Sequence, residues 1–276
     1  MHMALKEIWP HASLASFVRL YRIVDFEFDD DTPVPPKVYP PRPEQCIQFC
    51  PTPSYMVYAG SDTVIRPKNA FIQGQHTTVN YRYNFRRLLT VQAVFQPGAL
   101  FRLLGMPQTE ILDQLVEAED ILGPAVAHVN EQIFEAKDHA TMIAVVEKFL
   151  HGLIRKYKKD AHPMDVVMQH MLQPDASQNL DYFVDRANLS HRQFDRKFIE
   201  RAGVGAKEFL RVVRFYKAYL LKNRYPDLDW LSIALHCDCH DYQHLTRDYK
   251  DFTGYTPAQF FALGSPERTL GSEEVY

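Results

Sequence analysis

The sequence predicts an α+β multidomain fold, in which a β-rich, barrel-like N-terminal domain ending in helices precedes an all-α C-terminal domain. Three observations predict it. Eleven of the 18 prolines lie between Pro10 and Pro97, the apolar period changes from two residues to about 3.6 after Phe95, and the last hundred residues contain a degenerate repeat. A chain of 276 residues, 46% hydrophobic and 24% charged, has room for about two globular domains, and this composition excludes a disordered chain.

Short strands are expected in the N-terminal part. Proline removes a backbone donor and disfavours helix at the residue before it, so the proline-rich stretch excludes long helices. Apolar and polar residues alternate in segments 18–28, 47–49, 55–58, 70–73 and 88–95. In such a strand Cys46, Gln48 and Cys50 share one face and Ile47 and Phe49 the other, and we expect buried thiols. Short strands between Pro and Gly turns are typical of a small barrel or sandwich.

Helices are expected from Ala99 onward. Segments 99–104, 109–118, 126–136 and 141–157 carry the helical apolar rhythm, so about 99–157 forms a helical end to the first domain. The polar stretch 156–162 precedes Pro163 and is the expected linker. The predicted domains are therefore 1–160 and 161–264, followed by a flexible tail at 265–276.

The C-terminal domain repeats itself. Arg196 matches Arg247 at an offset of 51 residues, whereas Asn188 matches Asp238 at an offset of 50. Each copy is interpreted as a helix, a tight turn and a second helix, because Asn and Asp tolerate the left-handed backbone conformation of such a turn. The slip of one residue predicts a longer turn in the second copy.

Capping residues mark where the second helix of each copy begins. Ser190 in the first copy and Asp241 in the second can accept a hydrogen bond from a free amide of the first turn. Phe194 and Phe198, four residues apart, then face the core. One long linker helix at 207–223, stopped by Pro226, joins the two helix-turn-helix units.

The first unit carries Phe-Val-x-x-x-Asn-Leu-Ser-x-Arg-Gln-Phe-x-Arg-x-Phe from Phe183, and the second ends in Phe-Thr-Gly-Tyr-Thr-Pro-Ala-Gln-Phe at Phe260. With these motifs, about residues 164–263 resemble the AraC/XylS family of bacterial transcription regulators. The family usually has Gly at both turns, where this chain has Asn188 and Asp238, and an aromatic residue where Cys239 stands. Segments 43–48, 71–77 and 95–105 are similar to a sensor-like domain of some members.

The resemblance implies a cytoplasmic bacterial regulator, not an enzyme, that reads two successive major-groove segments of double-stranded DNA. It implies control by a signal at the N-terminal domain and no cofactor. RNA polymerase, a small-molecule effector and a second copy of the chain are the other partners that it suggests. A membrane partner is not expected, because no segment approaches the roughly 20 apolar residues of a bilayer span.

The candidate DNA-binding residues lie on the second helix of each unit and on the linker helix. They are His191, Arg192, Asp195, Arg196, Arg214, Tyr242, Gln243, Thr246 and Arg247. Arginine can read guanine edges, so Arg192 and Arg196 are assigned to bases and His191 to the backbone. Asp195 can accept from a cytosine amino group but repels phosphate. Arg214 stands where the family's linker helix usually carries arginine.

Charge is distributed unevenly along the chain. The formal net charge of −3 argues against a nucleic-acid partner when taken as a whole. Segment 192–224, however, has ten Lys and Arg against three Asp and Glu, whereas 225–264 has two against six. We therefore expect the first unit to anchor the protein on DNA and Arg196 to contribute more affinity than Arg247.

Two other interpretations stay open. The acidic second unit suits a protein-interaction module that keeps a degenerate helix-turn-helix domain. The cluster His236-Cys-Asp-Cys-His240, followed by His244, has the ligand types of a zinc site, so a metal-responsive regulator using His236, Cys239 and His240 is a further alternative. The favoured interpretation places Cys237 and Cys239 in the core, and no metal site is predicted.

Overall fold

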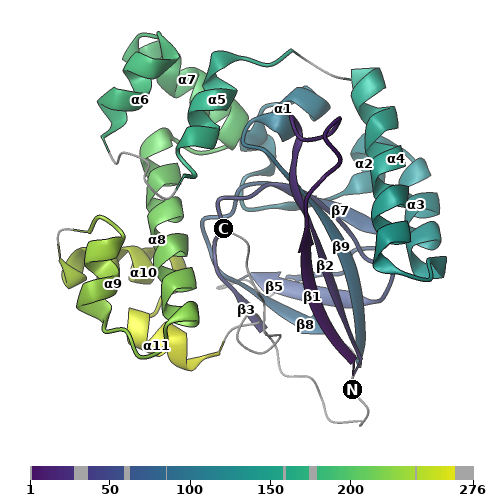
Figure 1. Ribbon diagram of the computed structural model, residues 1–276, viewed down its shortest axis with the longest axis horizontal. Coiled ribbons are helices and arrows are strands. Elements are labelled where there is room, and N and C mark those ends of the chain that lie inside the picture. The colour runs from purple at the N-terminus through teal and green to yellow at the C-terminus, as the bar shows by residue number, and fades with distance from the viewer. Residues whose placement is uncertain are drawn as a thin grey trace.

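The computed structural model describes residues 2–27, 37–58, 63–84, 86–157, 160–173, 179–239 and 241–264. Strands fill the N-terminal part and helices the C-terminal part, as the sequence predicts (Figure 1). The predicted tail at 265–276 lies outside the described residues, and the predicted division between 160 and 161 stays a prediction. None of the described helices combines the length and apolar content that crossing a bilayer requires.

The strands form two antiparallel sheets. They are β1 (His2–Ile8), β2 (Val18–Glu27), β3 (Lys37–Tyr39), β4 (Cys46–Phe49), β5 (Ser54–Tyr58), β6 (Val64–Ile65), β7 (Ala70–Gln73), β8 (Asn80–Asn84), β9 (Arg87–Phe95) and β10 (Leu115–Glu117). The large sheet has the order β1-β2-β9-β4-β7-β10 and the small sheet the order β3-β8-β5-β6. Within the described residues both sheets have open edges, so of the predicted barrel or sandwich the β-rich domain has two separate sheets that are not closed into a barrel.

Four α-helices and one 3-10 helix complete the N-terminal part. They are α1 (Ala99–Leu104), η1 (Gln108–Ile111), α2 (Ala118–Leu122), α3 (Ala125–Glu135) and α4 (His139–Tyr157). The helix expected at 109–118 is wrong, because residues 115–117 pair with β7 instead and continue the large sheet. Pairing with the edge of β7 stabilises the extended conformation more than the local apolar pattern stabilises a helix. This pairing depends on tertiary structure, so the apolar period of the segment alone does not reveal it.

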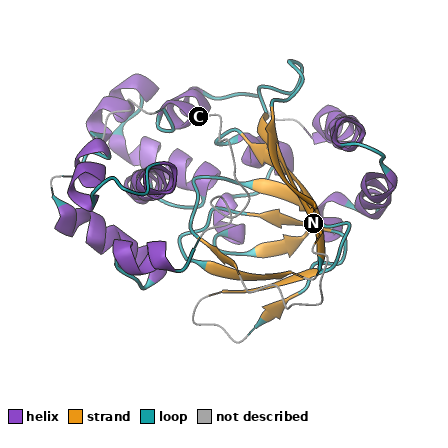
Figure 2. Cartoon of the chain, turned by 60° about the horizontal axis from the view of Figure 1, so that its bottom comes forward, coloured by secondary structure: helices purple, strands orange, loops and turns teal. Residues whose placement is uncertain are grey.

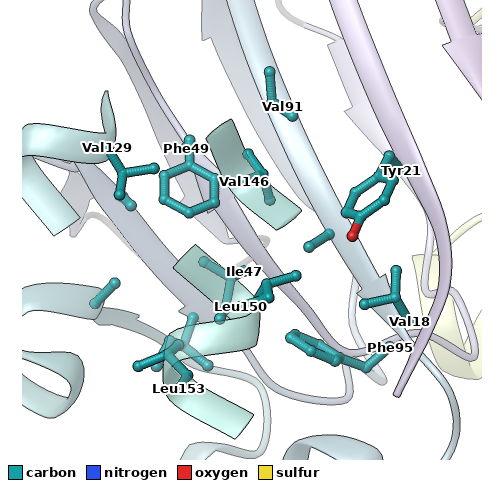
Figure 3. Close-up of a cluster of buried hydrophobic side chains, with 14 of the residues drawn as sticks. Val18, Tyr21, Ile47, Phe49, Val91, Phe95, Val129, Val146, Leu150 and Leu153 are labelled. Atoms are coloured by element: carbon teal, nitrogen blue, oxygen red, sulfur yellow. The ribbon is translucent and has the colours of Figure 1, made fainter. Parts of the chain in front are cut away.

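The two faces of the large sheet differ in chemistry. Val91 and Phe95 of β9 point into an apolar layer beneath α3 and α4, where Val129, Val146 and Leu150 meet them (Figure 3). Thr90 and Gln92, which alternate with Val91 and Ala93 along β9, line a cavity on the opposite side of the sheet. One face is therefore an ordinary hydrophobic core, and the other faces a hollow between the sheets.

Strand β4 follows the same alternation and confirms the prediction made for its cysteines. Ile47 and Phe49 belong to the apolar layer, whereas Cys46 and Gln48 line the cavity. Cys46 and Cys50 are 3% and 4% exposed. Burial raises the pKa of both thiols to about 12.

The C-terminal part is helical throughout its described residues. Its helices are α5 (Pro163–His170), α6 (Leu180–Ala187), α7 (His191–Ala202), α8 (Ala206–Arg224), α9 (Trp230–His236), α10 (Tyr242–Thr253) and α11 (Pro257–Ala262). Helix α8 stands between two helix clusters, α5–α7 at one end and α9–α11 at the other (Figure 1). Figure 2 shows this helical part on one side of the strands and further helices on the other.

Candidate nucleic-acid interface

The first helix-turn-helix unit is built from α6 and α7. Asn188 ends α6 with φ of 51°, in the left-handed region expected of it. Ser190 then caps α7, since its hydroxyl accepts from the Gln193 amide at 3.4 Å while the Gln193 side chain accepts from the Ser190 amide at 3.2 Å. Phe194 and Phe198 are fully buried. The predicted turn, cap and core positions of the first unit are confirmed.

The second unit repeats this construction in α9 and α10 with a longer turn. Asp238 has φ of 56°, and the Asp241 carboxylate caps α10 by accepting from the His244 amide at 2.7 Å. One residue separates the left-handed position from the cap in the first unit, whereas Cys239 and His240 separate them in the second. This extra residue accounts for the change of the repeat offset from 50 to 51.

The candidate residues of α7 lie on its exposed face. His191, Arg192, Asp195 and Arg196 are all exposed. Neither Arg192 nor Arg196 makes an ion pair or hydrogen bond with a described residue, whereas the His191 ring lies 3.6 Å from an Asp181 carboxylate oxygen. Both guanidinium groups are therefore available to a ligand in solution.

The candidate residues of α10 are less uniform. Gln243 and Arg247 are exposed, and Arg247 has no ion-pair or hydrogen-bond partner among the described residues. Tyr242 and Thr246 are half-buried, and the Thr246 hydroxyl donates to the Tyr242 carbonyl at 2.9 Å. Gln243 and Arg247, four residues apart on one helix face, therefore form the most accessible part of the second set.

Arg214 is placed inside the second unit, not on its outer face. Its Nε and one terminal nitrogen donate to the Asp248 carboxylate at 3.0 and 2.6 Å, and the same terminal nitrogen donates to His244 Nε2 at 3.1 Å. Only 9% of the Arg214 side chain is exposed. The guanidinium fastens α8 to α10, so Arg214 supports the second unit from within, and its assignment to DNA contact stays a prediction.

Several other cations of segment 192–224 are also internal. Arg201 donates to Asp165 at 3.0 Å, Arg211 donates to Asp248 at 2.9 Å, and the Lys222 ammonium donates to the carbonyls of Pro226 and Leu228. These groups neutralise acids or bind carbonyls within the fold, so the charge offered to solvent is smaller than the sequence count implies. That the first unit anchors the protein on DNA stays a prediction.

Two acidic residues of the second unit, Asp229 and Asp248, stabilise its helices. Asp229 caps α9 by accepting from the amides of Leu231 and Ser232 at 3.0 and 2.9 Å. Hydrogen bonds from Ser232 lower the pKa of this carboxyl. Asp248 is held between two arginines. The acidic balance of this unit therefore comes partly from helix capping and buried ion pairing.

The cysteines of the second unit lie in its core. Cys237 and Cys239 are 1% and 3% exposed, and burial raises their pKa to about 12 and about 11. The His236 Nδ1 lies 2.7 Å from the Ser232 carbonyl oxygen, and His240 lies outside the described residues. Across the part of the chain that the structure describes, no three His, Cys, Asp or Glu side chains form a metal-binding group.

The N-terminal domain packs against the end of α7, which sequence reasoning did not foresee. The Gln45 amide nitrogen donates to the carbonyls of Arg201 and Ala202, and the Arg201 guanidinium lies 4.7 Å from the centre of the Phe101 ring. Gly203 follows α7 with φ of 83°, and a Cβ placed there would lie 2.8 Å from the Gln108 carbonyl oxygen. These contacts leave the first turns of α7 open.

Comparison with known proteins supports the assignment of the C-terminal domain. Residues 183–262 match a family model described as a helix-turn-helix domain. A search of curated proteins gave no match.

Three solved structures are similar to this chain over most of its length but share little sequence identity with it. An apo variant of ToxT from Vibrio cholerae strain SCE256 is 13% identical over 90% of this chain and 97% of its own, with a TM-score of 0.48. Wild-type ToxT from that strain with an unsaturated fatty acid bound is 11% identical over 88% and 95%, also with a TM-score of 0.48. The AraC-like transcriptional activator CuxR is 12% identical over 78% and 86%, with a TM-score of 0.25.

Proposed function

We propose that the chain is a sequence-specific transcription regulator that reads two successive major-groove segments of double-stranded DNA, because residues 183–262 match a helix-turn-helix family model and resemble the AraC/XylS family in their motifs. One observation carries the proposal. Arg196 and Arg247, which the repeat matches, are both exposed, and both lack an ion-pair or hydrogen-bond partner among the described residues. They lie on the second helices of two units that the single helix α8 joins.

The arrangement suits DNA for physical reasons. Each second helix begins at a side-chain cap, so its first turns are ordered and can enter a major groove with Arg and Gln side chains facing base edges. Two helices on one support meet the same face of the duplex about 10 base pairs apart. We propose Arg192, Arg196, Gln243 and Arg247 as the base-reading set, with His191 near the backbone. Asp195, Tyr242 and Thr246 complete the exposed or half-exposed surface.

The experiment is selection of duplexes from a random pool by the full chain, followed by fluorescence anisotropy on the enriched duplex. We expect a shared motif and an affinity that falls steeply with salt. Arg196→Ala is expected to weaken binding by about 1–3 kcal/mol, and Arg247→Ala by less. Arg87→Ala removes the same charge from an exposed site on β9 and is the matched control.

Loss of affinity in Arg87→Ala equal to that in Arg196→Ala would show that only total charge matters. A larger loss in Arg247→Ala than in Arg196→Ala would overturn the order of the two units. Failure to enrich any motif would favour the alternative of a protein-interaction module, which the exposed Asp238 and Asp241 of the second turn support. Control by a signal at the N-terminal domain, and RNA polymerase or a second copy as partners, belong to the proposal as well.

A further inference from the structure

A cavity lies between the two sheets of the N-terminal domain. Its walls come from β1, β2, β4, β7 and β9 of the large sheet and from β3, β5 and β8 of the small one. It has space of about 50 Å³ for water-sized contents. Since one water needs about 10–15 Å³ of such space, the cavity holds about three to five waters or a molecule of similar size.

One wall of the cavity is a continuous polar network. Arg22 donates to the Gln92 side-chain oxygen at 3.0 Å, and Gln92 donates to the Gln48 oxygen at 2.6 Å. Arg82 of β8 donates to the same Gln48 oxygen at 3.0 Å and to the Gln73 oxygen at 3.1 Å. All the members except the half-buried Gln73 are buried. A buried polar network costs desolvation and fixes the positions of its members, so these side chains present ordered polar groups to the cavity.

The two arginines of the network differ in charge compensation. Arg22 has carboxylates on both sides, with Glu7 at 2.7 Å and Glu44 at 2.9 Å. Arg82 has only amide oxygens and the face of the Tyr39 ring, 4.2 Å from its guanidinium carbon. No carboxylate of a described residue lies within ion-pair distance of Arg82, although the residue is 9% exposed. Among the described residues, Arg82 is therefore a buried positive charge on the cavity wall with no carboxylate at ion-pair distance, whereas Glu44 of the same wall pairs with Arg22.

The donors of Arg82 are not all used. A guanidinium has five N–H groups. Nε donates to Asn80 and the two terminal nitrogens donate to Gln48 and Gln73, which leaves one N–H on each terminal nitrogen. Two N–H groups on one planar guanidinium match the two oxygens of a carboxylate.

We propose that this cavity binds a short-chain aliphatic carboxylate, with its carboxylate on Arg82. The rest of the ligand is expected to be aliphatic, because the apolar side chains of Val24, Met56 and Leu88 also line the cavity. The volume excludes a long chain. The ligand class is thus a small monocarboxylic acid, whose negative charge neutralises the guanidinium of Arg82.

The same strand connects the cavity to the second helix-turn-helix unit. On β8 and just before it, Asn80 and Arg82 line the cavity, while the Val79 amide donates to the Phe252 carbonyl at the end of α10 at 3.2 Å. The Val79 side chain is buried in the core of the second unit. Arg42, another wall residue, lies with its guanidinium carbon 5.3 Å from the centre of the Tyr216 ring on α8. Carboxylate binding therefore shifts the DNA affinity, a consequence that rests on the proposed function.

The first test is isothermal titration of the full chain with butyrate, with butyramide as the uncharged control and inorganic phosphate as a second anion. We expect butyrate to bind, butyramide to bind at least tenfold more weakly, and Arg82→Gln to weaken butyrate binding at least tenfold. Arg87→Gln, an exposed control on β9, retains wild-type affinity. Equal binding of butyrate and butyramide, or phosphate binding as tightly as butyrate, would overturn the proposed ligand class.

A second variant covers the case in which Arg82→Gln does not fold. Thr90→Leu adds volume to the buried wall residue Thr90 and keeps Arg82, so we expect a folded protein with at least tenfold weaker butyrate binding. Undiminished butyrate binding in Thr90→Leu would overturn the proposed location.

The second test measures anisotropy of the selected duplex with and without saturating butyrate. We expect at least a threefold change of DNA affinity in the wild type and none in Arg82→Gln or Thr90→Leu. Butyrate binding without any DNA binding would leave the cavity site standing and overturn the proposed function. DNA binding without butyrate binding would support the proposed function and overturn the cavity site. Binding of both DNA and butyrate without a change in DNA affinity would overturn the coupling through β8.

Discussion

The ion pair between α8 and α10 should determine whether the second unit is held together from within. Asp248 is 1% exposed at its side chain and takes two hydrogen bonds from Arg214, whose side chain is 9% exposed. Arg211 also donates to Asp248, but it has Glu208 and Asp251 as further acceptors. Among the described residues Asp248 is the acid within ion-pair distance of Arg214, so Asp248→Ala leaves a buried guanidinium without a carboxylate.

The size of the effect follows from this geometry. Removing one partner of a buried ion pair costs about 3–5 kcal/mol, because the other charge stays buried and unpaired. We therefore expect Asp248→Ala to lower the free energy of unfolding of the C-terminal domain by about 3–5 kcal/mol. Asp251→Ala is the control, since that side chain is 50% exposed and its ion pair should contribute no more than about 1 kcal/mol.

The assay is urea unfolding followed by tryptophan fluorescence in a Trp9→Phe background, which leaves Trp230 beside Tyr249 in the second unit as the reporter. The double variant Arg214→Met with Asp248→Leu removes both charges and should recover most of the loss. A loss below about 1 kcal/mol in Asp248→Ala would contradict the internal role of Arg214. So would a double variant as unstable as the single one.

Three further perturbations test other parts of the structure. Gly203→Ala should destabilise by about 1–2 kcal/mol or more in urea unfolding, because of the left-handed φ and the close Gln108 carbonyl, whereas Gly152→Ala, in open space on α4, should stabilise by about 0.5–1 kcal/mol. Equal effects would contradict the packing against Gln108. Burial lowers the pKa of His76 below its ordinary 6.5, so the unfolded chain takes up the proton first and stability decreases as pH falls below 6.5. His76→Gln should flatten that slope below pH 6.5, and an unchanged slope would count against the buried ring. Finally, the four buried thiols should resist iodoacetamide at pH 8 until urea unfolds the chain, and fast labelling of the native protein would contradict their burial.

Local chemistry explains what the sequence predicted well. Asn188 and Asp238 adopt positive φ, and Ser190 and Asp241 cap the helices that follow them, because a turn or cap depends on the residue and its immediate neighbours. The alternation in β4 likewise placed Cys46 and its neighbours on the correct faces, since the period of a strand is local too.

Contacts between residues far apart in the chain explain what the sequence did not predict. Residues 115–117 became strand β10 because the edge of β7 was available. Arg214 is assigned to DNA contact from its position on the linker helix, whereas its guanidinium donates to Asp248, which lies 34 residues further along the chain. The charge of Arg82 could be judged only after β4, β7 and β8 had been placed around it. Composition counts such charges without showing which of them the fold neutralises.

In the proposed function, the two units read one duplex through successive major grooves. Hydroxyl-radical footprinting of the wild-type protein on the selected duplex tests it most directly. We predict two protected segments about 10 base pairs apart on the same face, with Arg247→Ala weakening protection at one segment and Arg196→Ala at the other. A single protected segment, insensitive to Arg247→Ala, would contradict the claim.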